Sequence, residues 1–446
     1  MSVGEQPVGT GRIEIDAAGK AVAPGFIDAH THDDRALLSD PAMACKVSQG
    51  VTTVITGNCG ISLAPIRRAE RPPAPLDLLS RSASSFFERF ADYLDALASA
   101  PAAVNSVAQV GHSTLRVAHL ANLERPATAG EIRRMRADLE RSLNAGAAGL
   151  STGLFYPPAQ AASIDEVAEL ASGLVRFGGF HTTHMRDEGD RVHDSLAESF
   201  KIGRRAGVPV VISHHKCSGS ANFGRSTETL AMLDTARASQ TVGFDVYPYS
   251  AGSTSLAAGR RLGADRTTIS WSEPHPEFAG RDLDSVAAEL SLSVDETVAA
   301  LSPAGGIFYA MDETDVQRIV SHPAAIIGSD GLPHDTHPHP RLWGTFPRVL
   351  GRYSRELGLF RIEDAVAKMT SRSATTFGIR DRGLLQTGNY ADLVIFDPES
   401  VIDEATYADP QRQATGIELV VVNGTVVWQD RRSTGARPGR PLRPTR

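Results

Sequence analysis

Eight short apolar runs recur along this chain, and their rhythm constrains the fold more than any other feature. Each run ends in a polar or glycine-rich stop, an amphipathic helix follows, and the pattern begins again. Strands that alternate with helices in this way form a parallel sheet, because each helix returns the chain to the same edge. The runs are Val22–Ile27, Val51–Ile55, Val104–Val110, Ala147–Leu150, Gly179–Thr183, Val208–Ser213, Val242–Val246 and Ala324–Ile327.

Eight is the strand number of a closed (β/α)8 barrel. The helices between the runs have readable starts, since Thr128 with Glu131 and Ser163 with Glu166 form capping boxes before apolar stripes. A doubly wound open sheet would alternate similarly, but the first run is not followed by Gly-X-Gly-X-X-Gly and the sequence has no phosphate-binding loop. We therefore predict an α/β fold built on a TIM-like barrel, which 446 residues accommodate.

The segments outside the barrel predict a small flanking β-domain. Asn423-Gly424 lies between two apolar runs, which is a strong hairpin signal, and Arg12–Asp16 alternates like a short strand. The tail from Arg431 onward is basic and rich in Pro and Gly, which favours partial disorder. We expect residues 1–20 and 381–446 to build the flanking domain, and 21–380 to build the barrel, with a mouth insertion at about 251–320.

The mouth insertion contains a helix capped by Ser293 and Glu296 and is far longer than an ordinary connection. At this place it is expected to shape a pocket or a lid.

Composition excludes several classes of partner. The chain has 22% charged and 41% hydrophobic residues, a formal charge of -7 and no basic cluster, which argues against nucleic acid and anionic membranes. No apolar run reaches the ~20 residues of a membrane span and no signal peptide precedes the barrel, so we expect a cytoplasmic protein that acts on a small molecule. The oligomeric state stays open, and a monomer is compatible with the sequence. Three cysteines do not form a disulfide framework, so a cysteine with a special role is a ligand or a nucleophile.

The ends of the predicted strands are unusually polar. His30 and His32 follow the first strand at i and i+2, and extended backbone directs both imidazoles to one face, where they reach a single ion. The carboxyl ends of barrel strands carry the catalytic groups. Further polar side chains follow the later strands, namely Cys59, His184, His214, His215, Lys216, Tyr247 and Asp330. Together they supply the His, Cys and Asp ligands of a Zn2+-type site.

Six stretches also carry a family resemblance: Pro24–Asp34, Gly57–Gly60, His184–Glu188, Ser213–Lys216, Ser329–Gly331 and His339–Tyr353. They resemble the amidohydrolase superfamily, specifically the D-aminoacylases (N-acyl-D-amino-acid deacylases), over essentially the whole chain. His-X-His with an Asp after strand eight marks the superfamily broadly. Asn58-Cys59-Gly60, His214-His215-Lys216 and the stretch Gly344–Gly351 are more specific to the deacylase branch.

The resemblance implies a role for each matching residue. Cys59, His184 and His214 match the ligands of one tightly bound zinc, His30 and His32 match those of a second, weaker metal position, and Asp330 matches the catalytic carboxylate. Tyr156, Tyr247, Lys216 and Arg341 fall where family members grip the substrate.

Two departures from the family pattern bear on these roles. Strand four, Gly149–Gly153, has no Lys to bridge two metals, so the Cys59 thiolate is the expected bridge. The chain also begins some twenty residues before its first barrel strand, whereas relatives carry a longer leading β-segment, which implies an incomplete small domain or a misassigned start.

The implied activity is zinc-dependent hydrolysis of an N-acyl-D-amino acid to a carboxylate and the free D-amino acid. Zinc would polarise the amide and acidify water, Asp330 would transfer the proton, and the planar fork of Arg341 would bind the α-carboxylate.

One alternative is a deacylase specific for N-acyl-D-glutamate or N-acyl-D-aspartate, because Lys216 and Arg341 together suit a second carboxylate. A cyclic-amide hydrolase of the dihydroorotase or hydantoinase type is another, and a binding protein without catalysis is disfavoured by the full ligand set.

Overall fold

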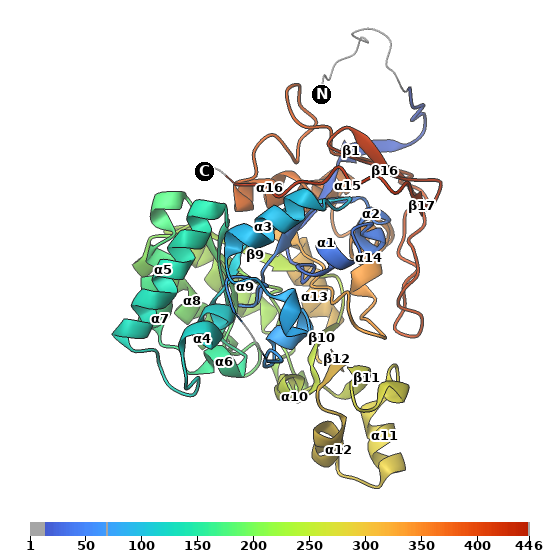
Figure 1. The fold of residues 1–446 in the computed structure, drawn as a ribbon. Coiled ribbons are helices and arrows are strands. Elements are labelled where there is room, and N and C mark those ends of the chain that lie inside the picture. The colour runs from blue at the N-terminus through green and yellow to red at the C-terminus, as the bar shows by residue number, and fades with distance from the viewer. Residues whose placement is uncertain (1–13, 68–69, 445–446) are drawn as a thin grey trace.

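A closed ring of parallel strands lies at the centre of the protein, whose computed structural model describes residues 14–67 and 70–444 (Figure 1). Within these residues the ring is built from β2 (Phe26–Asp28), β3 (Val51–Thr56), β4 (Asn105–Ala108), β5 (Val110–Gly111), β6 (Gly149–Gly153), β7 (Phe180–His184), β8 (Val210–Ile212), β9 (Val242–Val246) and β13 (Ala325–Ile327). β4 and β5 are two halves of one strand, divided at Gln109.

The ring closes between its first and last strands. Neighbouring strands pair in parallel from β2 to β4 and from β5 round to β13. At the seam, the amide of Ala29 donates to the carbonyl of Ile327 (3.1 Å), and the amide of Asp330 donates to the carbonyl of His30 (2.8 Å). The predicted barrel is therefore confirmed, and all of its strands point their carboxyl ends at one mouth.

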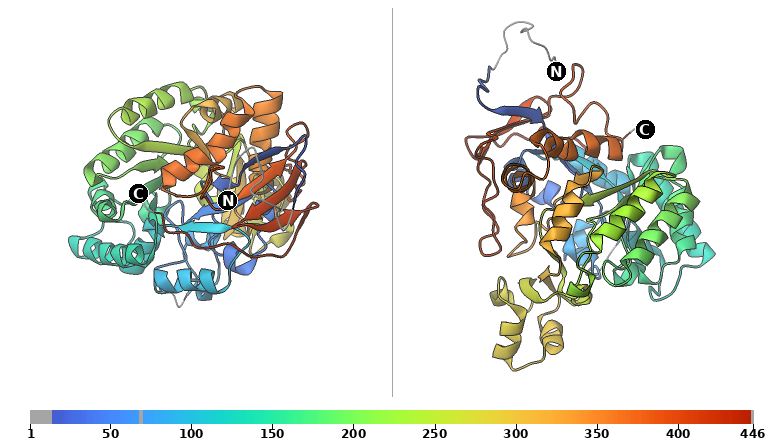
Figure 2. Two further views of the ribbon diagram at one scale, coloured as in Figure 1. Left: turned by 90° about the horizontal axis from the view of Figure 1, so that it is seen from above. Right: turned by 180° about the vertical axis from the view of Figure 1, so that it is seen from behind.

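Helices surround the ring (Figure 2). The longer ones are α3 (Phe90–Ser99), α4 (His112–His119), α5 (Ala129–Ala145), α7 (Ile164–Ser172), α8 (Val192–Ala206), α9 (Ser226–Arg237), α13 (Glu313–Ser321), α14 (Arg341–Arg348), α15 (Ile362–Met369) and α16 (Ser371–Phe377). Short helical turns lie at α1 (Ala36–Ser39), α2 (Ala44–Val47) and α6 (Pro157–Gln160), and a π-helical stretch, Val349–Glu356, continues α14. Amphipathic patterning directs their apolar faces inward, as Met135, Leu139 and Leu143 of α5 show.

Two predicted strands differ in position from the observed ones. The run Val22–Ile27 is split at Gly25, because β1 (Ala21–Pro24) pairs outside the barrel with β14 (Leu393–Phe396) and only Phe26–Asp28 enters the ring. The fourth barrel strand begins at Gly149 rather than Ala147, because Ala147 ends the preceding helix by donating its amide to the carbonyl of Ser142 (2.9 Å).

The flanking β-structure is a five-stranded antiparallel sheet in the order β1-β14-β15-β16-β17. Its later strands are β15 (Ile417–Val422), β16 (Thr425–Gln429) and β17 (Arg432–Ser433). The predicted hairpin is confirmed: Asn423 and Gly424 join β15 to β16 with φ of 50° and 79°, as a type I′ turn requires. The N-terminal strand predicted at Arg12–Asp16 lies partly outside the described residues, and Glu14–Asp16 form no strand.

The described part of the C-terminal tail, residues 431–444, is ordered rather than partly disordered. The amide of Gly439 donates to the carbonyl of Ala102 (2.9 Å), and the amide of Leu442 donates to that of Ser106 (2.7 Å). These hydrogen bonds place the tail along β4. Backbone pairing holds the tail there, although the tail has few apolar side chains to bury.

The insertion between β9 and β13 forms its own antiparallel sheet, ordered β10 (Ala251–Ser255), β12 (Ala304–Tyr309), β11 (Arg266–Ser272). The helices α10 (Leu256–Gly259), α11 (Leu283–Leu290) and α12 (Val294–Leu301) accompany it, and α11 and α12 project away from the barrel (Figure 1). Ile269, Val286 and Leu301 help to form a separate apolar core for this lobe. None of the described helices is both long and apolar enough to cross a membrane.

Candidate metal centre

Six polar side chains converge at the mouth of the barrel, each delivered by the exit of a strand. His30 and His32 follow β2, Cys59 follows β3, His184 ends β7, His214 follows β8 and Asp330 follows β13. All six are buried, and none is more than 7% exposed. A set of ionisable groups held this far from water must be paired or must bind a cation.

The backbone turns sharply at three of these positions. Cys59, His214 and Asp330 have positive φ angles of 52°, 36° and 51°. Residues other than glycine seldom adopt this left-handed region, and such conformations cost on the order of 1–3 kcal/mol. The surrounding barrel holds each turn in place and thereby directs a thiol, an imidazole and a carboxylate toward the centre of the mouth.

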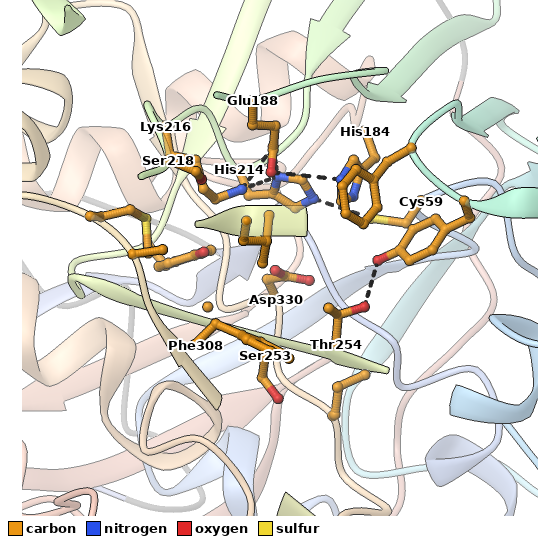
Figure 3. A pocket seen from close by; sticks show the side chains of 18 of the residues that line it. Cys59, His184, Glu188, His214, Lys216, Ser218, Ser253, Thr254, Phe308 and Asp330 are labelled. Carbon is orange, nitrogen blue, oxygen red and sulfur yellow. Dashed lines mark hydrogen bonds and ion pairs between the residues drawn. The ribbon is translucent and has the colours of Figure 1, made fainter. Parts of the chain in front are cut away.

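The donor atoms fall into two groups that share one residue. Cys59, His184 and His214 form one group, while His30, His32, Cys59 and Asp330 form the other, and within each group the donor atoms lie within 4.8 Å of one another. Cys59 Sγ lies 3.3 Å from His30 Nε2. It also lies 3.3 Å from His214 Nε2 (Figure 3). Its sulfur therefore stands where one ligand could serve two ions.

Electrostatics favour an anionic sulfur at this point. Burial opposes ionisation of Cys59, but His30 and His214 lower the pKa of its thiol well below the usual value. In the opposite direction, burial raises the pKa values of Cys45 and Cys217 to about 12. The described cysteines thus divide into one thiolate and two inert thiols.

Asp330 is held as a carboxylate beside two of the histidines. Its Oδ1 lies 3.2 Å from His32 Nε2 and 3.4 Å from His30 Nε2, and its Oδ2 lies 2.8 Å from Arg341 Nη1. Burial opposes the charge, but Arg341 and the neighbouring histidines lower the pKa of Asp330 well below its usual range. Although burial disfavours the imidazolium, hydrogen bonds to Asp330 and Cys59 raise the pKa of His32 to about 9. The anions therefore create a strong preference for positive charge at this centre.

The residues present fit a metal ion. Buried His184 makes no hydrogen bond through either ring nitrogen to the described residues, and His32 Nδ1 is also unpaired. Such nitrogens are costly to bury unless they bind something. One thiolate with several imidazoles is a ligand set that suits zinc. The structure thus brings together all five residues that the sequence predicts as metal ligands.

Two carboxylates that orient the histidines were not assigned from the sequence. Asp245 Oδ2 lies 3.3 Å from His30 Nδ1, and its Oδ1 accepts from the amide of His214 (2.8 Å). Glu188 lies between Lys216, His214 and His184, with its Oε1 3.0 Å from His214 Nδ1 (Figure 3). Contacts of this kind fix the tautomer and ring orientation of a ligand. Asp245 could have been identified from the sequence, because it is a charged residue inside the apolar run Val242–Val246.

The four predicted substrate-binding residues all lie at or beside the same cavity. Tyr156, Lys216 and Tyr247 line it, and the Arg341 guanidinium stacks on the ring of Tyr247 at 4.5 Å. The Tyr156 hydroxyl lies 2.9 Å from Thr254 Oγ1, and Lys216 Nζ donates to Glu188 Oε1 (2.8 Å). Ser253 and Thr254 reach the cavity from the insertion, where no sequence signal identified them.

The apolar part of the cavity comes from several separate segments, including strand β12. The lining side chains are Leu78, Phe155, Leu262, Phe308, Ala310, Met311 and Leu332.

Comparisons with known proteins agree with this geometry. A model of the amidohydrolase family matches residues 14–428. The chain is 55% identical over 441 residues to a D-aminoacylase of Alcaligenes xylosoxydans xylosoxydans, covering 99% of this chain and 91% of that protein.

Two solved structures are also similar. One concerns the binuclear metal center of a D-aminoacylase, with a TM-score of 0.94, 57% identity, and coverage of 97% of this chain and 90% of the other. The second is an N-acyl-D-glutamate deacylase from Bordetella bronchiseptica complexed with zinc and a phosphonate that mimics the tetrahedral intermediate. Its TM-score is 0.93, with 44% identity and coverage of 96% and 90%.

Proposed function

Because this chain belongs to the amidohydrolase family, in its D-aminoacylase branch, we propose that its barrel mouth hydrolyses N-acyl-D-amino acids with apolar side chains. The protein is a zinc-dependent hydrolase that releases a carboxylate and a free D-amino acid. One observation supports the assignment of residues: the Cys59 sulfur belongs to both ligand groups and lies beside the carboxylate of Asp330.

The metal would be held by the two ligand groups. Cys59, His184 and His214 form the tight position, and His30, His32 and Asp330 offer a second position that shares the Cys59 sulfur. Zinc held by these residues would supply a Lewis acid that polarises the amide carbonyl and lowers the pKa of water toward ~7. Asp245 and Glu188 keep the imidazoles in orientation through the contacts described above.

Asp330 moves the proton. Its low pKa keeps it ionised at neutral pH, so it accepts a proton from the attacking water and then delivers that proton to the departing amide nitrogen. Positioned acid–base transfer of this kind is typically worth on the order of 10²–10⁴-fold in rate. Departure of the protonated nitrogen yields the free amino acid.

Arg341 is suited to hold the α-carboxylate of the substrate. Its Nη1 contacts Asp330 and its Nη2 donates to the carbonyl of Ser253 (3.2 Å), while Nε, though buried, makes no hydrogen bond to the described residues. A guanidinium beside the catalytic carboxylate places the substrate's α-carbon next to the reacting amide. Lys216 and Tyr247 would complete this polar side of the cavity.

The lining of the cavity supports an apolar side chain rather than an acidic one. Seven apolar residues line the wall, and Lys216 is the one ammonium among the described lining residues. That ammonium is already engaged by Glu188 and lies 2.7 Å from His214 Nδ1. A second substrate carboxylate would therefore lose its hydrating water molecules on binding without forming an ion pair with an unengaged cation.

A kinetic panel tests this proposal. N-acetyl-D-leucine and N-acetyl-D-methionine should exceed N-acetyl-D-glutamate and N-acetyl-D-aspartate in kcat/KM, with zinc content measured on the same sample. A preference for the acidic substrates would overturn the apolar assignment, and turnover of cyclic amides in place of open-chain substrates would favour a hydantoinase-type reaction.

A further inference from the structure

A lysine lies beneath the metal centre with no exposed surface. Lys46 is on the short helix α2, and its Nζ donates to Asp28 Oδ2 (2.8 Å) and Ser329 Oγ (2.9 Å), with Asp33 Oδ2 at 3.2 Å. All four residues are completely buried, and Lys46 does not line the substrate cavity. A buried ammonium is costly unless it is paired, and the partners of Lys46 offset this cost.

The partners of Lys46 belong to the two strands that close the barrel. Asp28 ends β2, two residues before His30, and Ser329 follows β13 and immediately precedes Asp330. Asp28 Oδ1 also accepts from the amide of Ser329 (2.7 Å) and lies 3.3 Å from that of His30. Lys46 therefore ties the exit of the first strand to the exit of the last.

Through Ser329, Lys46 supports the residues on both sides of Asp330. The Ser329 hydroxyl that accepts from Lys46 also receives the amide of Gly331, at 3.3 Å. Asp330 sits between them with a φ of 51°, a conformation that does not persist without external support. The direction of its carboxylate toward His32 and Arg341 is set by this turn.

Gln49, three residues after Lys46, also holds helix α14, which carries Arg341. Gln49 Nε2 donates to the carbonyl of Leu342 (2.8 Å), and Gln49 Oε1 accepts from the amide of Phe346 (3.2 Å). Lys46 and Gln49 thus fix the proton-transfer carboxylate and the guanidinium relative to one another. Burial opposes the charge on Lys46, yet Asp28 and Asp33 raise the pKa of its ammonium above the usual value, so the tie stays ionic.

We propose that Lys46 is a positioning residue for the hydrolysis proposed above: through Ser329 and Asp28 it holds the Asp330 carboxylate against the histidines and Arg341. The inference rests on that proposed function. It assigns Lys46 no contact with substrate or metal.

The test replaces Lys46 by methionine, which keeps the length of the side chain and removes its charge. Because a displacement of about 1 Å can cost 10²-fold in rate, kcat for N-acetyl-D-leucine should fall between about tenfold and 100-fold. KM should stay within about threefold and zinc content should be unchanged. Ser329→Ala, which removes the hydroxyl between Lys46 and Gly331, should lower kcat in the same direction.

Matched variants separate positioning from stability. Lys368 is a second buried lysine, on α15, whose Nζ donates to the carbonyl of His322 and whose pKa burial lowers to about 7, so Lys368→Met removes a buried amino group far from the mouth. It should lower the melting temperature with little change in kcat. Lys46→Met combined with Asp28→Asn should recover part of the stability, because of the two carboxylates that pair with Lys46 only Asp33 then remains, but should not recover kcat.

Three outcomes would overturn the proposal. The first is a folded, zinc-loaded Lys46→Met enzyme with kcat within twofold of wild type, and the second is a loss of activity proportional to loss of zinc. If Lys46→Met does not fold, unchanged kcat in Ser329→Ala overturns it instead. Absence of wild-type activity on every N-acetyl-D-amino acid would defeat the proposed function itself, which keeps the two failures distinguishable.

Discussion

At the scale of single residues, one thiol differs from the other two because of its neighbours. Cys59 lies among histidines that lower the pKa of its thiol, whereas burial, with a contribution from nearby carboxylates, raises the pKa values of Cys45 and Cys217 to about 12. The position of Cys59 at a strand exit could be predicted from the sequence. The electrostatic contrast could not, because it depends on side chains more than a hundred residues away, such as His214.

The first prediction concerns the replacement of these cysteines by alanine. Cys59→Ala should lose most bound zinc and nearly all activity while remaining folded, because the barrel has its own apolar core. Cys45→Ala and Cys217→Ala should keep full zinc content. Metal analysis and circular dichroism on the three purified variants check this, and a zinc-replete Cys59→Ala protein would contradict the ligand assignment.

The second prediction separates chemistry from recognition. Asp330→Asn removes the proton acceptor but keeps the size of the side chain, so kcat should fall by on the order of 10²-fold or more with substrate still bound. Arg341→Lys keeps the charge but removes the planar fork, so the loss should lie chiefly in KM, at roughly 1.5–3 kcal/mol. Steady-state kinetics with N-acetyl-D-methionine distinguish the two. A normal kcat in Asp330→Asn would refute the proton-transfer role.

At the scale of secondary structure elements, Glu166 shows how tertiary contacts redirect a local motif. The sequence predicts a capping box at Ser163, and Ser163 does accept the amide of Glu166 at 3.1 Å. The Glu166 carboxylate instead pairs with buried Arg116 and lies 3.0 Å from His112 Nε2. At Thr128, where no buried arginine competes, the capping box forms as predicted. Local pattern fixed the helix start in both cases, but only the fold decides which partner a carboxylate takes.

The third prediction follows from that buried pair. Although burial opposes ionisation, hydrogen bonding and charge interaction with His112 and Arg116 lower the pKa of Glu166 from 4.5 to about 2. The pair therefore stabilises the fold above pH 4.5, and this contribution is lost as the pH falls toward 2. Glu166→Gln should cost about 3 kcal/mol at pH 7, and the difference from wild type should shrink below pH 4.5.

Urea denaturation at several pH values measures this effect. Glu169 is more than half exposed in its pair with Arg136, so Glu169→Gln should change the free energy of unfolding by less than about 1 kcal/mol. A pH-independent difference between Glu166→Gln and wild type would show that the charge is not responsible.

The fourth prediction concerns the insertion. The sequence suggested a lid around Ser293–Leu301, but α12 lies in the projecting lobe, and the cavity is lined instead from β10 and β12. Phe308 belongs both to the lobe core and to the cavity wall, whereas Phe278 belongs to the lobe core alone. Phe308→Ala should raise KM for N-acetyl-D-leucine by about tenfold or more, since a large apolar contact is lost. Phe278→Ala should reduce stability with KM within twofold.

At the scale of the whole molecule, long-range pairing decided what the sequence left open. The eight runs predicted the barrel, but β1 belongs to the flanking sheet because its partner is β14, some 370 residues later. The tail likewise is held by hydrogen bonds to residues distant in sequence, among them Ala102, Ser106 and Asn423. We propose the division into barrel, mouth insertion and flanking β-domain on this basis, with Ala21–Pro24 assigned to the flanking domain.

The last prediction is that metal removal weakens the entire barrel mouth. The ligands proposed for the tight position come from the exits of β3, β7 and β8, so one zinc ties together strands that are distant in sequence and on opposite parts of the ring. An ion that binds only the folded state stabilises it by about 4 kcal/mol when present at a thousand times its Kd. Chelation should therefore lower the melting temperature by several degrees. Zinc should restore it while magnesium, which prefers oxygen ligands, should not. Cys59→Ala should respond much less to chelator and zinc. If a wild-type sample stripped of all zinc melted at the same temperature as the loaded enzyme, the ligands would not be acting as a link between the strand ends.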